Sequence, residues 1–199
     1  MTDTEFKERE LMLTGVGGQG VQLAAQTLAR AATLEDRHVM LLGTYGGTMR
    51  GGNTESVIVV GAGPLSSPPI VSRIWSAIAL HSRFWHPIRA KLPAGALLLV
   101  NSTLFEEALD PGHFRLFELP ATQIANEHGS TAGASMVAIG GYAKLTELVA
   151  IESLIEAMRS SLPEYRRQHA DVNEALLRAG FAHFDAVEVP AWEAMESVA

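Results

Sequence analysis

The stretch LMLTGVGGQGVQLAAQTLAR, residues 11–30, joins an apolar run to a helical pattern through a cluster of glycines. The apolar run over residues 10–15 predicts a short buried strand that ends at these glycines. Residues 21–34 predict a helix, because apolar side chains recur on one face and polar side chains on another. Residues 15–20 fit the pattern G-x-G-x-x-G, which typically links a strand to a helix. The stretch therefore predicts the first strand–turn–helix unit of an α/β fold.

The rest of the chain continues with apolar runs separated by helical patterns. The further strand candidates are residues 38–42, 55–60, 74–80, 96–100 and 114–119, and the further helix candidates are residues 82–92, 133–149, 151–160 and 171–179. In the last helix, Asp171 stands three residues before Glu174 as a cap, and Gly180 is expected to end the helix. Buried strands that alternate with helices predict a three-layer α/β domain, with a mostly parallel sheet covered on both faces.

The composition excludes several classes of protein. The chain has no cysteine, so it forms no disulfide and cannot hold an iron–sulfur cluster on thiolates of its own. A formal net charge of −7, without clustered Lys and Arg, argues against nucleic-acid binding. The longest apolar run, residues 94–100, is too short to span a membrane. Residues 1–10 show no secretory signal, so the expected location is the cytoplasm.

The glycine turn after the first strand allows several interpretations. A dinucleotide-binding fold normally places Asp or Glu at the end of the second strand, to hold the ribose hydroxyls. Here that strand ends at residues 42–44, Leu-Gly-Thr, so this part of the fingerprint is missing. A purely structural turn, another phosphate-bearing or polar ligand, and a closely approaching subunit remain open. The amide of Gln19, between two glycines, could reach such a partner.

A second glycine-rich loop follows the second predicted strand. Its sequence is TYGGTMRGGN, residues 44–53, in which Tyr45 offers a stacking face and Arg50 a fork of donors for phosphate or carboxylate. An ordinary solvated surface loop is the simpler interpretation. The carboxyl ends of parallel strands lie at one edge of the sheet, where ligands usually bind, so we expect the two glycine loops to converge there.

Five motifs in fixed order resemble a known family. They are GVGGQGV, TYGGTMRGGN, LSSPPIVSR, LLLVNSTL and LPATQIANEHGSTAGASMVAIG, and the resemblance that they carry covers roughly residues 11–181. The combination resembles the gamma subunit, or gamma domain, of 2-oxoacid:ferredoxin (acceptor) oxidoreductases of the pyruvate, 2-oxoglutarate and arylglyoxylate types. The chain departs from the family pattern at Gly47 and Thr48, where a Glu is usual, and at Ser135, where many members have Asn.

The resemblance implies a fold and a division of labour. The family's complexes decarboxylate a 2-oxoacid on thiamine diphosphate, pass electrons to iron–sulfur clusters and usually deliver the acyl group to coenzyme A. The gamma component is a Rossmann-like α/β domain that packs against the catalytic subunits and helps to receive coenzyme A. Thiamine diphosphate and the clusters are expected on the alpha, beta and delta-type partner subunits, which agrees with the absence of cysteine here.

Function and site residues are therefore expected as follows. The chain is a gamma subunit without activity of its own, and the stand-alone NAD- or FAD-binding domain is the alternative. Residues 1–181 form one domain, and residues 182–199 a tail that could dock on a partner. No catalytic residue and no metal ligand are expected in this chain. Coenzyme A is expected at the complex interface, near the candidate binding residues Gly17, Gly18, Gln19, Gly20, Tyr45, Gly46, Met49, Arg50, Gly51, Gly52 and Asn53.

The substrate could be pyruvate, 2-oxoglutarate, or a branched-chain or aromatic 2-oxoacid; TYGGTMRGG is closer to the 2-oxoglutarate and arylglyoxylate types. The final electron acceptor, ferredoxin or NAD, is left open.

Overall fold

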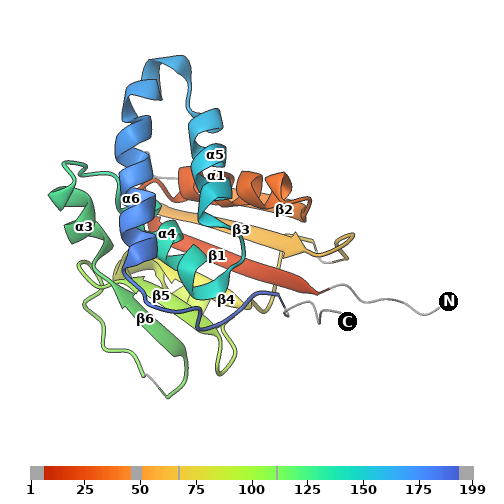
Figure 1. Cartoon of the computed structure of the whole chain (residues 1–199). Coiled ribbons are helices and arrows are strands. Elements are labelled where there is room, and N and C mark those ends of the chain that lie inside the picture. Colours follow the sequence, from red (N-terminus) through yellow and green to blue (C-terminus); the bar gives the residue numbers. More distant parts are fainter. Residues whose placement is uncertain (1–6, 46–50, 67, 111, 193–199) are drawn as a thin grey trace.

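All the strands predicted from the sequence form, and they pair into one six-stranded sheet (Figure 1). The computed structural model describes residues 7–45, 51–66, 68–110 and 112–192, with the backbone alone for Tyr45, Tyr165 and Arg166. The strands are β1 (Glu8–Val16), β2 (His38–Tyr45), β3 (Asn53–Gly61), β4 (Ser76–Ala79), β5 (Leu97–Asn101) and β6 (Arg115–Leu119), in the order β2-β3-β1-β4-β5-β6. Strand β3 runs antiparallel to β1 and β2, and β1, β4, β5 and β6 pair in parallel. The predicted α/β fold with a mostly parallel sheet is confirmed.

The strand register places both glycine loops at one edge of the sheet. Val16, the last residue of β1, pairs with Asn53 at the start of β3, and Tyr45 at the end of β2 pairs with Thr54. The turn after β1 and the connection between β2 and β3 therefore leave the sheet side by side. This edge is the carboxyl end of β1 and β2, where α/β folds place their ligands.

The longer helices cover one face of the sheet. They are α1 (Val21–Leu34), α3 (Ala121–Glu127), α4 (Ala134–Thr146), α5 (Ile151–Ser161) and α6 (Ala170–Ala182), with a 3₁₀ turn, η2 (Glu164–His169), between α5 and α6. Helix α1 has the predicted bounds, whereas α3 was not predicted. The helix predicted over residues 82–92 is instead a 3₁₀ turn, η1 (Ser82–Phe84), and a short helix, α2 (His86–Arg89). Pro87 explains the break, because it has no N–H to donate and is accommodated in the first turn of α2.

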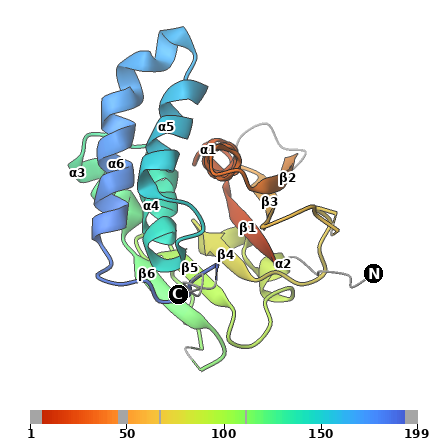
Figure 2. The ribbon, with the colours of Figure 1, turned by 45° about the vertical axis from the view of Figure 1, so that its right-hand side comes forward.

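Helices α5 and α6 lie side by side and rise away from the sheet (Figure 2). Ion pairs hold them together: Glu174 on α6 accepts hydrogen bonds from Arg159 on α5 at 2.7 Å and from Arg178 at 2.9 Å. These two guanidinium groups, Arg159 first, lower the pKa of the Glu174 carboxyl. Arg178 also reaches Glu152 at the start of α5, at 3.1 Å.

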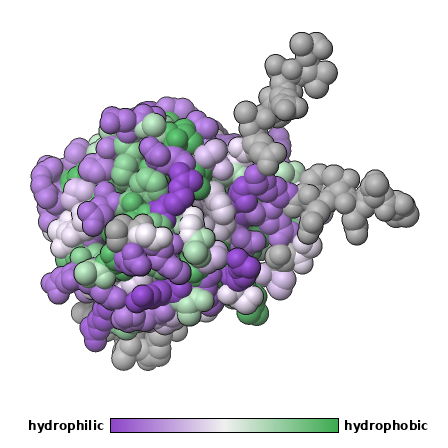
Figure 3. Space-filling model, turned by 90° about the horizontal axis from the view of Figure 1, so that it is seen from below, coloured by the Kyte–Doolittle hydropathy of each residue, from purple (hydrophilic) through white to green (hydrophobic). Residues whose placement is uncertain are grey.

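The two faces of the sheet have different cores. Helix α4 is buried along almost its whole length, and Tyr142 on it forms a 2.8 Å hydrogen bond with Ser76 of β4. Burial raises the pKa of Tyr142 well above its usual value. On the opposite face, fully buried Trp85 donates through Nε1 to Glu107 at 2.6 Å and packs near Phe114. Seen from the side away from the long helices, the surface mixes hydrophilic and hydrophobic residues (Figure 3).

Glycines bring α4 and α6 into close contact, which corrects the predicted end of α6. Gly180 was expected just beyond the helix, but it lies within α6. A Cβ on Gly180 would overlap the carbonyl oxygen of Val137, and a Cβ on Gly140 would overlap that of Leu177. Asp171 was expected as the cap and instead lies in the first turn of α6. These glycines let the two helix backbones approach each other more closely than side chains would allow.

Residues 183–192 pack on the body of the protein. The backbone N–H groups of Glu188 and Val189 both donate to the carbonyl of Leu145 at the end of α4. Arg9 donates through Nε to the carbonyl of Ala191 at 2.8 Å, and Trp192 donates through Nε1 to that of Leu148 at 3.1 Å. Residues 193–199 lie outside the described part of the chain. Docking of this tail on a partner subunit therefore stays a prediction.

Candidate ligand and subunit site at the glycine loops

The first glycine loop is a tight turn closed by its own glutamine. Gln19 Oε1 accepts a hydrogen bond from the Val16 N–H at 2.7 Å, and the Gln19 N–H donates to the Val16 carbonyl at 3.0 Å. Gly18 and Gly20 have φ angles of 105° and 79°, which side chains disfavour. The side-chain carbonyl of Gln19 is therefore used to shape the turn, while the turn itself presents backbone groups at the sheet edge.

The two glycine loops meet, as predicted. The Gly17 N–H donates to the Gly52 carbonyl at 2.8 Å, and a Cβ on Gly17 would lie 3.5 Å from the Gly51 nitrogen. Gly51 has a φ of 74°. The turn after β1 and the start of β3 thus form one continuous backbone surface.

Asn53, the last candidate residue of the second loop, is held by its neighbours on the sheet. Its Nδ2 donates to the Glu55 carboxylate at 2.6 Å, and its Oδ1 accepts a 3.5 Å hydrogen bond from fully buried Thr14. From α1, Gln22 reaches across and donates to the Glu55 carbonyl at 2.8 Å. The beginning of β3 is therefore fixed from two sides.

The remaining candidates of the second loop lie outside the described residues. These are Gly46, Met49 and Arg50, together with the side chain of Tyr45. Their expected roles stay predictions. The described residues on either side place both ends of this loop beside the first glycine turn.

A pocket of about 470 Å³ opens on the other side of Gly20, between the starts of α1 and α4 and the beginning of α6. Its lining includes Ser135 and the segment 129–133, which sequence reasoning did not assign to a site. The segment carries a signal in hindsight: Gly, Ser and Thr directly precede a helix of small residues. The sequence could not show that the segment 129–133 lies next to Gly20, on the first glycine loop.

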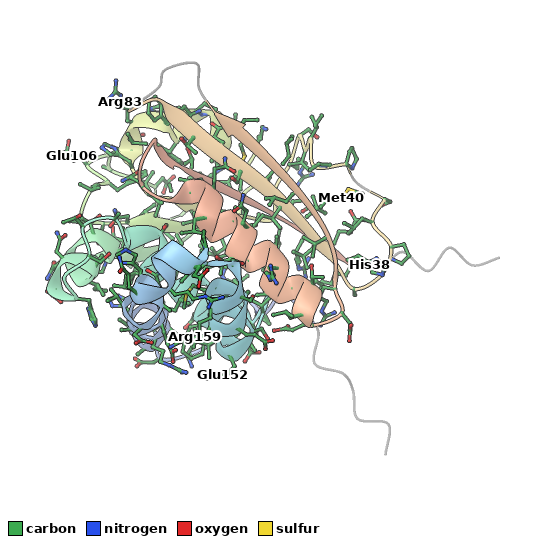
Figure 4. All side chains as sticks on the ribbon, turned by 90° about the horizontal axis from the view of Figure 1, so that it is seen from above. His38, Met40, Arg83, Glu106, Glu152 and Arg159 are labelled. Carbon is green, nitrogen blue, oxygen red and sulfur yellow. The ribbon has the colours of Figure 1, made fainter. Side chains whose placement is uncertain are left out.

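Strand β2 forms an open edge of the sheet, which corrects the expectation that the strands are buried. Leu34, Met40, Leu41 and Leu42 are each more than a third exposed, and His38 and Met40 lie on this outer strand (Figure 4). A groove of about 740 Å³ runs between α1 and β2 and reaches Ser160 and Ser161. We call the four exposed apolar residues, with this groove, the β2 edge. Exposed apolar side chains gathered on one edge are typical of a surface that contacts another protein.

Comparison with known proteins identifies the family. Residues 10–183 match the family model for pyruvate ferredoxin/flavodoxin oxidoreductases. The chain belongs to this family. It is 32% identical over 183 residues to the ketoisovalerate oxidoreductase subunit VorA of Methanothermobacter thermautotrophicus, covering 89% of this chain and 37% of VorA. It is 28% identical over 159 residues to the 2-oxoglutarate synthase subunit KorC of Methanocaldococcus jannaschii, covering 78% of this chain and 84% of KorC.

Solved structures agree with this assignment. The gamma subunit of a keto/oxoacid ferredoxin oxidoreductase from Geobacter sulfurreducens superimposes with a TM-score of 0.75 at 28% identity, covering 88% of this chain and 95% of that one. The 2-oxoglutarate:ferredoxin oxidoreductase from Magnetococcus marinus shares the fold, with a TM-score of 0.81 at 17% identity over 92% of this chain and 33% of that one. The chain is a gamma-type member of the oxidoreductase family, and the stand-alone dinucleotide-binding alternative gains no support.

Proposed function

We propose that this chain is the gamma-type subunit of a complex that oxidatively decarboxylates a 2-oxoacid to an acyl-CoA. The single observation that carries the proposal is the family match, which extends over residues 10–183. The relatives are named as subunits of ketoisovalerate oxidoreductase and of 2-oxoglutarate synthase. Thiamine diphosphate and iron–sulfur clusters would be held by alpha, beta and delta-type partners, since this chain has no cysteine to ligate a cluster. The chain alone would have no activity.

In this proposal the two glycine loops line a groove that receives coenzyme A. Backbone N–H groups at a glycine turn and a helix start suit the phosphates of such a ligand. The Magnetococcus marinus enzyme was solved with 2-oxoglutarate, coenzyme A and succinyl-CoA bound. The guanidinium of Arg50 would pair with a phosphate of coenzyme A, or with a carboxylate across the subunit interface.

Since coenzyme A is an intracellular cofactor, we place the complex in the cytoplasm. No helix in the described ranges is long and apolar enough to cross a membrane.

The β2 edge is proposed to take part in assembly. It combines an open strand edge with apolar side chains that would be covered in a complex.

The substrate is proposed to be 2-oxoglutarate or an aromatic 2-oxoacid, because the second glycine loop is closest to those types. The two relatives named above act on different 2-oxoacids, so a substrate screen on the assembled complex is needed to choose.

Arg50→Ala in the assembled complex tests the proposed groove. We expect the KM for coenzyme A to rise about tenfold or more, because a charged hydrogen bond to phosphate is worth about 1.5–3 kcal/mol. The matched control is Arg167→Ala, an exposed arginine between α5 and α6. It should leave the KM, the turnover and the subunit composition unchanged. If Arg50→Ala behaves like this control, Arg50 does not contact coenzyme A or a partner, and the proposed groove is wrong.

A further inference from the structure

The outer side of strand β2 carries a row of backbone groups that the sheet does not use. In the ladder between β1 and β3, the Gly17 N–H donates to the Gly52 carbonyl, so the even-numbered residues of β3 bond to β1. Because hydrogen-bonded and non-hydrogen-bonded pairs alternate along antiparallel strands, the odd-numbered residues of β3 bond to the even-numbered residues of β2. Val39, Leu41 and Gly43 therefore direct their N–H and C=O groups away from the sheet.

Strand β2 lacks the features that usually protect a free edge. Natural edge strands are commonly guarded by Lys, by Pro, by inward-pointing charges or by their shortness. Residues 38–45, HVMLLGTY, form a strand of eight residues without Lys, Arg, Asp, Glu or Pro. The strand lies at the outer rim of the sheet, where Figure 4 labels His38 and Met40. An unguarded apolar edge of this length is expected to be covered by another strand.

Both faces of β2 offer apolar side chains to such a strand. Val39 and Leu41 line the groove against α1, so the odd-numbered residues face the long helices. Side chains alternate along a strand, so Met40 and Leu42 face the opposite side. Leu41, Met40 and Leu42 are each more than a third exposed. A strand added at this edge would cover apolar surface on both sides of the sheet.

Strand β2 is complementary to itself when two copies run antiparallel about a two-fold axis. With Leu41 opposite Leu41 of the second copy, Val39 lies opposite Gly43 of the second copy. Each of these pairs consists of residues whose backbone groups point outward, so each pair can exchange two hydrogen bonds. Between them, Met40 lies opposite Leu42 of the second copy, on the face away from the long helices. A two-fold contact requires a self-complementary surface of this kind.

The charges at this edge are also complementary in that register. His38 lies opposite Thr44 of the second copy, and Thr44 pairs with Glu55 within its own sheet. His38 of one copy and Glu55 of the other are then two strands apart on the same face, with about 10 Å between their Cα atoms. A protonated imidazole and a carboxylate therefore face each other, and the two-fold axis repeats the contact. The register places no charges of like sign opposite each other, since residues 38–45 hold no acidic side chain and no Lys or Arg.

We propose that β2 pairs with β2 of a second copy of this chain, antiparallel and with Leu41 on the two-fold axis, so that one sheet continues through the dimer. The inference rests on the proposed role of the β2 edge in assembly, and it is independent of the substrate and of coenzyme A. The second copy is then one of the partner subunits that co-purify with a tagged chain.

Sedimentation velocity of the full chain over a range of concentrations tests this inference. We expect a monomer–dimer equilibrium in the wild type. Met40→Lys and Leu42→Glu should each raise the dimer dissociation constant at least about tenfold, because each places a charge against an apolar side chain of the second copy. The matched control is Val172→Glu on α6, which replaces an apolar residue that is 37% exposed, against 36% for Leu42. It should leave the dissociation constant unchanged.

A mixture of the two variants tests the register. In a dimer of one Met40→Lys chain and one Leu42→Glu chain, the new lysine lies opposite the new glutamate, and the other Met40–Leu42 contact is unchanged. The mixture should therefore dimerise at least about fivefold more tightly than either variant alone. Far-UV circular dichroism of each variant checks that it is folded.

The outcomes separate this inference from the proposed function. A wild-type chain that stays monomeric at every concentration overturns the inference, as does a dimer that neither Met40→Lys nor Leu42→Glu weakens. Weakened dimers without rescue in the mixture contradict the register centred on Leu41. None of these results affects the proposed function, because the family match does not depend on this contact. A purified complex without 2-oxoacid oxidation would contradict the proposed function and leave the dimer standing.

Discussion

Gly20→Ala should destabilise the protein for two separable reasons. Gly20 has a φ of 79°, and a left-handed conformation costs an L-residue with a Cβ about 1–2 kcal/mol. The new Cβ would also lie 2.6 Å from Ser135 Oγ, well inside van der Waals contact. Relief of that contact by rotation of Ser135 should cost about 1 kcal/mol. The smaller entropy of the unfolded chain offsets about 0.5 kcal/mol, so we expect a net loss of about 2 kcal/mol in the free energy of unfolding.

A double-mutant cycle by urea unfolding separates the two terms. In the Ser135→Ala background the nearest side-chain atom to the new Cβ is the former Ser135 Cβ, at 3.6 Å, which is an ordinary contact. The cost of Gly20→Ala should then fall by about 1 kcal/mol, which is the coupling energy of the pair. The control is Gly17→Ala, whose Cβ would have 3.5 Å to its nearest atom at an ordinary φ. That substitution should change stability by less than about 0.5 kcal/mol.

Two results would refute this reasoning. Equal effects of Gly20→Ala and Gly17→Ala would mean that the backbone at Gly20 is not left-handed. A coupling energy near zero would mean that the Ser135 hydroxyl does not face Gly20.

Three further predictions concern the core and the β2 edge. Gly180→Ala should cost at least about 2 kcal/mol in urea unfolding, despite alanine's higher helix propensity, because its Cβ would overlap the carbonyl of Val137; a gain in stability would contradict this. Burial keeps the pKa of Tyr142 above its unfolded value near 10, so its contribution is present below pH 10 and is lost as pH rises further. Tyr142→Phe should flatten that alkaline loss and cost about 1–3 kcal/mol at neutral pH, because Ser76 loses its partner; an unchanged pH profile between pH 8 and about 11 would contradict it. Leu41→Ser should cost the isolated chain about 1–2 kcal/mol, because Leu41 is 37% exposed and otherwise covered, and should reduce the yield of co-purified partner subunits; an unchanged yield would remove the β2 edge from assembly.

Much of the fold could be predicted from local pattern. The bounds of α1 follow from the glycine turn before Val21 and the end of the apolar periodicity at Leu34. The exposure of β2 could not be predicted, because its apolar run reads like that of a buried strand. An edge position depends on strand order, which the sequence of one element does not contain. Gly180 was misread for the same reason: a glycine near a helix end resembles a cap, and only the close approach of α4 reveals its packing role.

The site was partly predictable. A general rule of α/β folds was sufficient to bring the two glycine loops together, and the hydrogen bond from Gly17 to Gly52 confirms it. The pocket at Ser135 was missed because residues 129–133 reach Gly20 only through the tertiary packing of α4 against the sheet. Nothing in the sequence around Gln19 distinguishes a side chain that contacts a ligand from one that closes the turn. In the structure, Gln19 closes the turn by accepting a hydrogen bond from the Val16 N–H.

The central claim is that this chain works as the gamma-type subunit of a larger oxidoreductase. The most direct measurement is anaerobic affinity purification of the tagged chain from its native cells, with mass spectrometry, iron, sulfide and thiamine analysis, and a 2-oxoacid oxidation assay on the same sample. The account predicts stoichiometric cysteine-containing partners, iron–sulfur clusters, thiamine diphosphate, and oxidation of a 2-oxoacid that depends on coenzyme A. A lone homo-oligomer that binds NAD, with no partner subunit and no cluster, would contradict it.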